Sequence, residues 1–146
     1  MISFKQNEYN KILNEINKKL STCGYTIDDL FFHHLHFDKK FTDPFGVYIA
    51  IEKQSYIVYY LNIHGVENKE TFSTREELIF QIIWDGVVNY TLQTYKNNYR
   101  KAALDLLRKI DINYYNRIVS RKSLSLWFLF GFINVADALT TESWKL

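Results

Sequence analysis

VYIAIEKQSYIVYYLNI, residues 47–63, is the stretch that decides the fold, because its apolar residues recur at every second position. This period is typical of β-strands that have two different faces. It predicts one strand over Val47–Glu52 and a second over Tyr56–Ile63, joined by a hairpin loop at Gln54-Ser55. Val66–Phe72 could add a third, more polar edge strand, which makes an antiparallel meander the economical topology.

Each strand residue is assigned to one face of the expected sheet, because alternate residues on neighbouring strands share a side. The face that we expect to pack against the helices carries Ile49, Ile51, Ile57, Tyr59 and Leu61. The opposite face is expected to present Tyr48, Glu52, Tyr56, Tyr60 and Asn62.

Outside this stretch the apolar residues recur every three or four positions, which is the period of a helix. The pattern predicts helices over Tyr9–Leu20, Thr74–Tyr95 and Asn98–Ile110, and Asp111 can cap a further turn or two. Ser73 and Glu76 have the spacing of a capping box at the start of the second of these helices. Strands followed by helices predict an α+β fold with a small antiparallel sheet, in a single domain over residues 1–146.

The segment Tyr25–Phe41 is ambiguous in the sequence. Thr26 followed by Asp29 could cap a short helix, whereas the dense Phe and His content also suits an extended segment. Asp43-Pro44-Phe45-Gly46 has the composition of a turn, because proline presets φ and glycine tolerates the left-handed region.

The composition is that of a globular protein, with 47% hydrophobic and 17% aromatic residues among 146. A net charge of only +2 argues against a grip on nucleic acid by the whole surface. The single Cys23 cannot form an intramolecular disulfide, which fits a reducing compartment. The N-terminus lacks the features of a signal peptide, and the most apolar run, Leu126–Ile133, is too short to span a membrane. We therefore expect a soluble, cytoplasmic protein without membrane contact.

The residues give no sign of catalysis, of a metal site or of a cofactor. His33, His34 and His36 stand close together, but no ligand spacing links them to one another or to Cys23 and Asp38. Packing or surface roles explain these histidines best, and no nucleophile elbow, phosphate loop or dinucleotide-binding glycine pattern occurs. We predict that the protein is not an enzyme.

Basic residues are concentrated between Lys96 and Lys122, a stretch that contains eight of them and only two acidic residues. A candidate basic patch comprises Arg100, Lys101, Arg108, Lys109, Arg117 and Arg121. A nucleic-acid-binding protein would lay them along a phosphate backbone, with tyrosines interleaved for stacking. The alternative, a solvated side of two helices, is favoured because Tyr99 and Tyr114 fall on the apolar stripes and no nucleic-acid-binding signature accompanies the charge.

The segment Leu124–Leu139 carries too many large apolar residues to remain in free solvent. We expect it to pack inside the monomer, with homodimerisation as the second possibility.

A series of short motifs between Tyr56 and Arg117 resembles one family. A Tyr-rich strand is followed by a turn with glycine, a helix start with Ser/Thr and acids, an aromatic helix and a leucine-rich helix. In the same order, these motifs are Tyr56-Ile57-Val58-Tyr59-Tyr60, Gly65-Val66-Glu67, Ser73-Thr74-Arg75-Glu76-Glu77-Leu78, Ile82-Ile83-Trp84-Asp85 and Asp105-Leu106-Leu107-Arg108-Lys109-Ile110. Tyr114 and Arg117 follow the last motif and end the pattern. This order resembles the bacterial immunity proteins of polymorphic toxin systems, in the family called immunity protein 63.

The resemblance implies a non-enzymatic protein that binds one cognate toxin domain and neutralises it in the cytosol. On that basis we expect Tyr48, Glu52, Tyr56, Tyr60 and Asn62 to contribute to toxin binding, because tyrosine offers large contact area with few torsions. The alternative is that the segment Tyr25–Phe41 covers these rings and makes a second small core.

Overall fold

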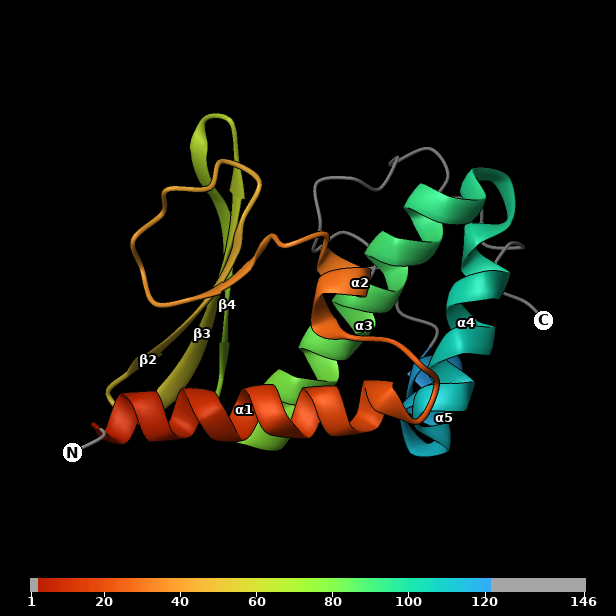
Figure 1. Cartoon of the computed structure of the whole chain (residues 1–146), viewed down its shortest axis with the longest axis horizontal. Coiled ribbons are helices and arrows are strands. Elements are labelled where there is room, and N and C mark those ends of the chain that lie inside the picture. The colour runs from red at the N-terminus through yellow and green to blue at the C-terminus, as the bar shows by residue number, and fades with distance from the viewer. Residues whose placement is uncertain (1–2, 122–146) are drawn as a thin grey trace. The chain divides into compact units, whose positions relative to one another are not determined.

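A computed structural model describes residues 3–121, and of Arg121 only the backbone. It has an α+β fold, as the sequence predicts, with five α-helices, one short 3-10 helix and a four-stranded sheet in the described residues. The backbone contacts divide the chain into two compact units, Met1–Ile82 and Ile83–Leu146. The expected single domain over residues 1–146 stays a prediction. Figure 1 labels the α-helices of both units and the strands β2, β3 and β4.

The sheet belongs to the first unit and has the order β1-β2-β3-β4, with β1 at Leu35–Phe37, β2 at Val47–Glu52, β3 at Ser55–Asn62 and β4 at Gly65–Phe72. The last three strands pair antiparallel, which confirms the meander. The sheet as a whole is mixed, because β1 pairs parallel to β2. The sequence pattern did not indicate β1 as a member of the sheet, where it adds a parallel strand at the edge of the predicted meander.

The turn between β2 and β3 is one residue shorter than the gap between the two predicted strands, because Ser55 belongs to β3. Glu52 pairs with Ser55, so the two turn residues are Lys53 and Gln54, with φ of 47° and 67°. Two successive positive φ values are typical of a type I′ turn, whose twist matches that of a hairpin. Because side chains alternate along a strand, a shift by one residue moves a whole strand's side chains to the other face.

The observed pairing therefore redistributes the strand residues between the two faces of the sheet. Each cross-strand pair shares a side, and the pairs are Ile49 with Val58, Ile51 with Tyr56, and Val47 with Tyr60 on one face, which we call the inner face. The outer face carries Tyr48 with Tyr59, Ala50 with Ile57, and Glu52 with Ser55. The predicted common face of Ile49, Ile51, Ile57, Tyr59 and Leu61 is wrong for this reason.

Helix α1, Phe4–Ser21, lies against the inner face. It starts earlier than the predicted Tyr9, because the hydroxyl of Ser3 accepts a hydrogen bond from the Gln6 amide and caps the helix. The ring of Tyr9 contacts Phe37 of β1, at 5.1 Å between centroids. Ile12, Ile16 and Leu20 continue the buried stripe along the helix.

The ambiguous segment contains both structures that its sequence suggests. Thr26 and Asp29 form a reciprocal capping box at the start of α2, Ile27–Phe31. The helix ends where Phe32 adopts the left-handed conformation, and β1 follows after two further residues.

Helix α3, Arg75–Tyr95, begins in the first unit. Its cap is Thr74, whose hydroxyl accepts a hydrogen bond from the Glu77 amide at 3.2 Å. The predicted capping box of Ser73 and Glu76 is therefore displaced by one residue. The helix is buried on every side from Leu78 to Asn89, which explains why its apolar stripe is broad in the sequence.

The second unit continues through the 3-10 helix η1, Lys96–Asn98, into α4, Tyr99–Ile110, and α5, Ile112–Arg121. A single residue, Asp111, separates α4 from α5, and its carboxylate accepts the amide of Asn113 at 2.9 Å. This confirms the predicted cap. The apolar stripe of α4 is buried, as predicted, at Ala103, Leu106, Leu107 and Ile110.

No helix in residues 3–121 is long and apolar enough to cross a membrane. The prediction that Leu124–Leu139 packs on the domain or on a second copy lies outside the described residues.

Candidate protein-binding surface

The five residues proposed from sequence as a toxin-binding face do not lie together. Tyr48 and Glu52 are on the outer face of the sheet, whereas Tyr56 and Tyr60 are on the inner face. Tyr48 is 2% exposed and Tyr60 is 3% exposed, so neither ring can contact a partner. Tyr56 and Asn62 are half-buried, and Asn62 accepts the amide of His64 in the turn after β3. The single face expected for these residues is wrong, because the hairpin register differs by one.

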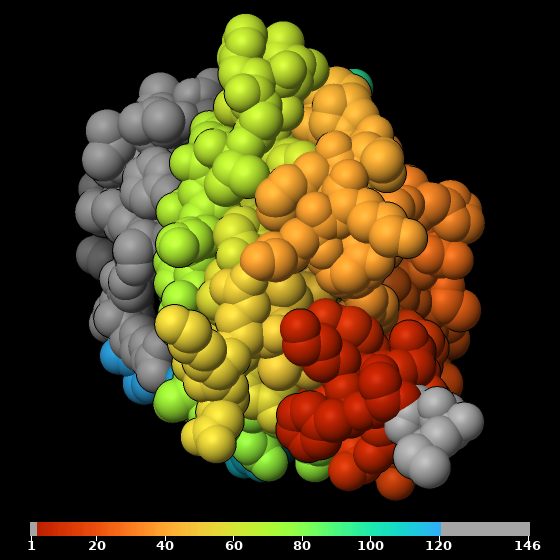
Figure 2. Space-filling view, turned by 90° about the vertical axis from the view of Figure 1, so that its left-hand side faces the viewer, coloured from red at the N-terminus to blue at the C-terminus, as the bar shows by residue number. Residues whose placement is uncertain are grey.

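The outer face is covered by the loop at residues 38–46, which we call the aromatic loop. It connects β1 to β2, and Figure 2 shows it as the orange segment that lies against the yellow and yellow-green strands. Phe41 contacts the rings of Tyr48 and Tyr59 edge-on, at 5.1 and 5.3 Å between centroids. Lys39 forms an ion pair with Glu52. A small second core thus lies under the loop, but of the rings in the sequence-based alternative it contains only Tyr48, because Tyr56 and Tyr60 lie on the inner face.

The length of the loop explains why it crosses the sheet so closely. Parallel strands are ordinarily joined by a crossover of a dozen or more residues, which contains a helix. Here β1 ends at Phe37 and β2 begins at Val47, which leaves nine residues for the whole return. The loop must therefore run along the outer face as extended chain and turns, and side-chain contacts must hold it there.

Asp43 holds the loop in place with both of its carboxylate oxygens. Oδ2 lies 2.7 Å from His34 Nδ1 and 2.8 Å from His36 Nε2, while Oδ1 accepts the backbone amide of Phe45. An ionised carboxylate only accepts hydrogen bonds, so both imidazoles donate to it. Partial burial alone would raise the pKa of Asp43, but the hydrogen bonds from the two histidines bring it below its ordinary value.

The backbone of Asp43 is held as well. Its amide donates to the Tyr48 hydroxyl at 2.8 Å, which satisfies the polar tip of that buried ring. Gly46 follows, and a Cβ at this position would lie 2.4 Å from the Tyr48 ring and 3.0 Å from the Asp43 carbonyl oxygen. Only glycine leaves room for this close approach.

The backbone around the loop adopts conformations that side chains rarely tolerate. Phe32, His33, Asp38 and Phe41 all have φ between 38° and 96°. Left-handed conformations of bulky residues cost free energy and persist where the surrounding contacts fix them, and they are concentrated at functional sites.

Large apolar side chains remain exposed at this rigid loop. Phe45 is 47% exposed and Phe41 is 37% exposed, although Phe41 also packs on the sheet. The ring of Phe45 approaches His34 edge-on at 6.2 Å, and its backbone is fixed by Asp43. Exposed aromatic residues on a fixed backbone have the character of binding hot spots.

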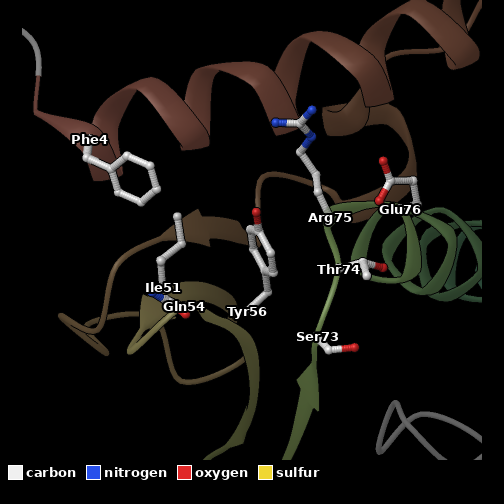
Figure 3. Close-up of a pocket in the computed structure, with 8 residues that line it drawn as sticks. All are labelled: Phe4, Ile51, Gln54, Tyr56, Ser73, Thr74, Arg75 and Glu76. Atoms are coloured by element: carbon white, nitrogen blue, oxygen red, sulfur yellow. The ribbon is translucent and has the colours of Figure 1, made fainter.

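A surface hollow lies beside the turn that joins β2 to β3. It has a volume of about 400 Å³, and its lining residues are shown in Figure 3: Phe4, Ile51, Gln54, Tyr56, Ser73, Thr74, Arg75 and Glu76. Arg75 and the hydroxyl of Tyr56 both point toward α1. There Glu8 accepts hydrogen bonds from Tyr56 at 2.7 Å and from Arg75 at 2.8 Å, and Arg75 also approaches Glu15.

This charge network ties α1 to β3 and to the start of α3. The hydrogen bond from Tyr56 and the Arg75 guanidinium together hold the pKa of Glu8 below its ordinary value, although burial opposes them. Burial and the bond to Glu8 raise the pKa of Tyr56 to about 12. Since Arg75 is occupied by two carboxylates, the network has a structural role.

The candidate basic patch lies in the second unit. Lys101, Arg108 and Lys109 are exposed on α4, while Arg100 and Arg117 are half-buried. The Arg100 guanidinium lies over the Tyr99 ring and that of Arg108 over the Tyr115 ring. The side chain of Arg121 lies outside the described residues.

Sequence reasoning missed the pairing of the histidines with Asp43. Seven and nine residues separate Asp43 from His36 and His34, and no spacing rule connects them. The turn composition at Asp43-Pro44-Phe45-Gly46 was the available signal. In the described part of the chain no group of three His, Cys, Asp or Glu residues is arranged to hold a metal ion.

No family model, curated protein sequence or solved structure matches this chain. The family resemblance therefore depends on the sequence motifs alone, and the surface must be interpreted from its own chemistry.

Proposed function

We propose that this chain is an immunity protein, which binds a cognate toxin domain in the cytosol and neutralises it without catalysis. The observation that carries the proposal is the exposure of Phe41 and Phe45 on a loop that Asp43, His34, His36 and Tyr48 hold in one conformation. A surface fixed before binding loses little conformational entropy on association, which favours the high affinity that neutralisation requires. The sequence motifs supply the class of partner.

This proposal replaces the sheet face expected from the sequence with the aromatic loop. The rings of Tyr48 and Tyr59 pack against Phe41 of the loop. Glu52 forms an ion pair with Lys39 and accepts a hydrogen bond from the Tyr59 hydroxyl. These residues would then affect binding indirectly, through the position of Phe41.

Phe45→Ala is expected to weaken binding of the toxin domain at least about tenfold, because it removes an aromatic contact from the centre of the surface. The backbone amide of residue 45 remains, so its bond to Asp43 is kept and the thermal unfolding temperature should change little. The measurement is calorimetric titration with the C-terminal domain of a toxin encoded beside this chain, together with protection of cells that express that domain.

Phe4→Ala is the matched control, because Phe4 is more exposed than Phe45 but lies at the start of α1 beside the hollow of Figure 3. It should leave the affinity unchanged. Equal affinities for the wild type and Phe45→Ala would remove the aromatic loop from the interface. A wild type that neither binds nor protects would overturn the proposed function.

A nucleic-acid-binding regulator is the second candidate function, favoured by the exposed Lys101, Arg108 and Lys109 on α4. Its affinity for a labelled DNA duplex would fall steeply between about 50 and 200 mM salt. The slope of log affinity against log salt concentration is roughly proportional to the number of phosphates contacted. Binding of the toxin domain through Phe45 would show a weak salt dependence instead, because the contact is apolar.

A further inference from the structure

The turn between β3 and β4 exposes two large aliphatic side chains in the first unit. Ile63 is 68% exposed and Val66 is 49% exposed. We call residues 61–66 the hairpin tip. In Figures 1 and 2 the yellow-green turn extends past the other parts of the first unit.

The hairpin tip is a fixed structure. Gly65 has a φ of 109°, which glycine adopts without strain, and the Asn62 side chain accepts the amide of His64 at 2.7 Å. Leu61 pairs with Val66 and Asn62 with Gly65, beyond an irregularity in register between Tyr60 and Leu61. Such irregularities re-aim the end of a hairpin and are typical of functional positions.

The tip is continuous with the aromatic loop. The amide of Leu61 donates to the carbonyl of Gly46 at 3.0 Å, so the residue after Phe45 is bound to the base of the tip. Phe41, Phe45, Ile63 and Val66 are therefore presented by two segments that are joined through backbone contacts. Exposed large apolar residues on neighbouring segments mark candidate interaction sites in soluble proteins.

The chemistry of the tip differs from that of the strand that follows it. Residues 61–66 contain no Lys, Arg, Asp or Glu, whereas Glu67, Lys69 and Glu70 follow at once. Charges on an edge strand protect it from pairing with other chains. The edge of β4 is thus protected by charges, while the tip carries none of these four residue types and exposes Ile63 and Val66 beside His64.

We propose that the hairpin tip inserts into an apolar cleft of the toxin domain, with Ile63 and Val66 as the inserted side chains. The inference rests on the proposed function and specifies how the partner is engaged. A projecting turn is convex, so only a concave partner surface can bury both of its aliphatic side chains. Clefts of this shape, largely apolar with few polar groups, are where proteins bind substrates, so insertion would block the toxin directly.

The test uses the full chain with Ile63→Thr and Val66→Thr combined. Threonine keeps the β-branched shape and the strand preference, and replaces an apolar contact by a hydroxyl. We expect the affinity for the toxin domain to fall at least about tenfold in calorimetric titration, because a desolvated hydroxyl without a partner opposes insertion. Because both positions are exposed, the unfolding temperature should stay within a few degrees of the wild type.

The matched control is Ile112→Thr with Val119→Thr, which makes the same chemical change at exposed aliphatic residues of α5 in the second unit. It should leave the affinity unaltered. If the tip variant binds as tightly as the wild type while Phe45→Ala binds weakly, insertion is wrong and the immunity function stands. If the wild type does not bind the toxin domain, both proposals are overturned. Partition of the wild type, but not of the tip variant, into vesicles of zwitterionic and anionic lipid would identify the tip as a lipid contact and also overturn insertion.

Discussion

Gly46→Ala is expected to destabilise the protein by about 2–3 kcal/mol, a large cost for the addition of one methyl group to a packed site. The added Cβ would meet the Tyr48 ring at 2.4 Å, the Asp43 carbonyl at 3.0 Å and the His36 ring at 3.2 Å. The Tyr48 ring cannot move aside cheaply, because it is buried and its hydroxyl accepts the Asp43 amide. Urea unfolding followed by circular dichroism measures the effect.

Substitutions at two further glycines distinguish the steric cost of an added Cβ from the cost of an unfavourable backbone conformation. Gly24 and Gly65 have positive φ, but no atom lies within 4 Å of a Cβ added to either. Alanine there should cost only about 1 kcal/mol, through backbone conformation alone. In a Tyr48→Val background, which removes the ring, Gly46→Ala should cost much less than in the wild type. Equal costs in the two backgrounds would mean that the ring is not the obstacle.

Arg75→Ala is expected to destabilise the protein by about 3 kcal/mol, because it leaves the Glu8 carboxylate buried with only Tyr56 as a partner. Glu8 is 6% exposed, and Arg75 supplies its charge-assisted hydrogen bond at 2.8 Å. Urea unfolding at pH 7 gives the cost. Adding Glu8→Gln to Arg75→Ala should recover part of the stability, since it removes the uncompensated charge.

The pH dependence of the same variant provides an independent check. The pKa of Glu8 lies below its ordinary value of 4.5 in the folded protein, so its ionisation stabilises the fold above that pH. This stability is lost as the pH falls through the folded-state pKa. The difference in unfolding free energy between the wild type and Arg75→Ala should therefore be full at pH 7 and smaller at pH 3. A difference that stays constant with pH would show that Arg75 acts by packing alone.

The strands were predictable because each has a period-two pattern of its own, and β2 was located to the residue at Val47–Glu52. The register between them was not, because it depends on how many residues form the turn, and Ser55 pairs with Glu52 as part of β3. Lys53 and Gln54 are neither Asn nor Gly, the residues that ordinarily indicate a type I′ turn. A one-residue error in the length of the turn then places Tyr56 and Tyr60 on the wrong face.

The candidate site was harder to predict than the fold, because it is made by segments without a period. Strand β1 has only three residues, and its parallel partner lies beyond a loop too short for an ordinary crossover. The pairing of Asp43 with His34 and His36 follows from that crossover and has no local signature. Composition indicated a turn at Pro44, but gave no sign that the turn lies against the sheet.

The nine-residue aromatic loop between β1 and β2 also determines how β1 unfolds locally. Two backbone bonds bracket β1, from the Val47 amide to the His34 carbonyl and from the Asp38 amide to the Ile49 carbonyl. Because β1 is so short and depends on the loop, both bonds should break in one cooperative event when the loop lifts, well before global unfolding. Hydrogen exchange at these two amides would then proceed at a common rate, and a partner seated on Phe45 would slow both amides together.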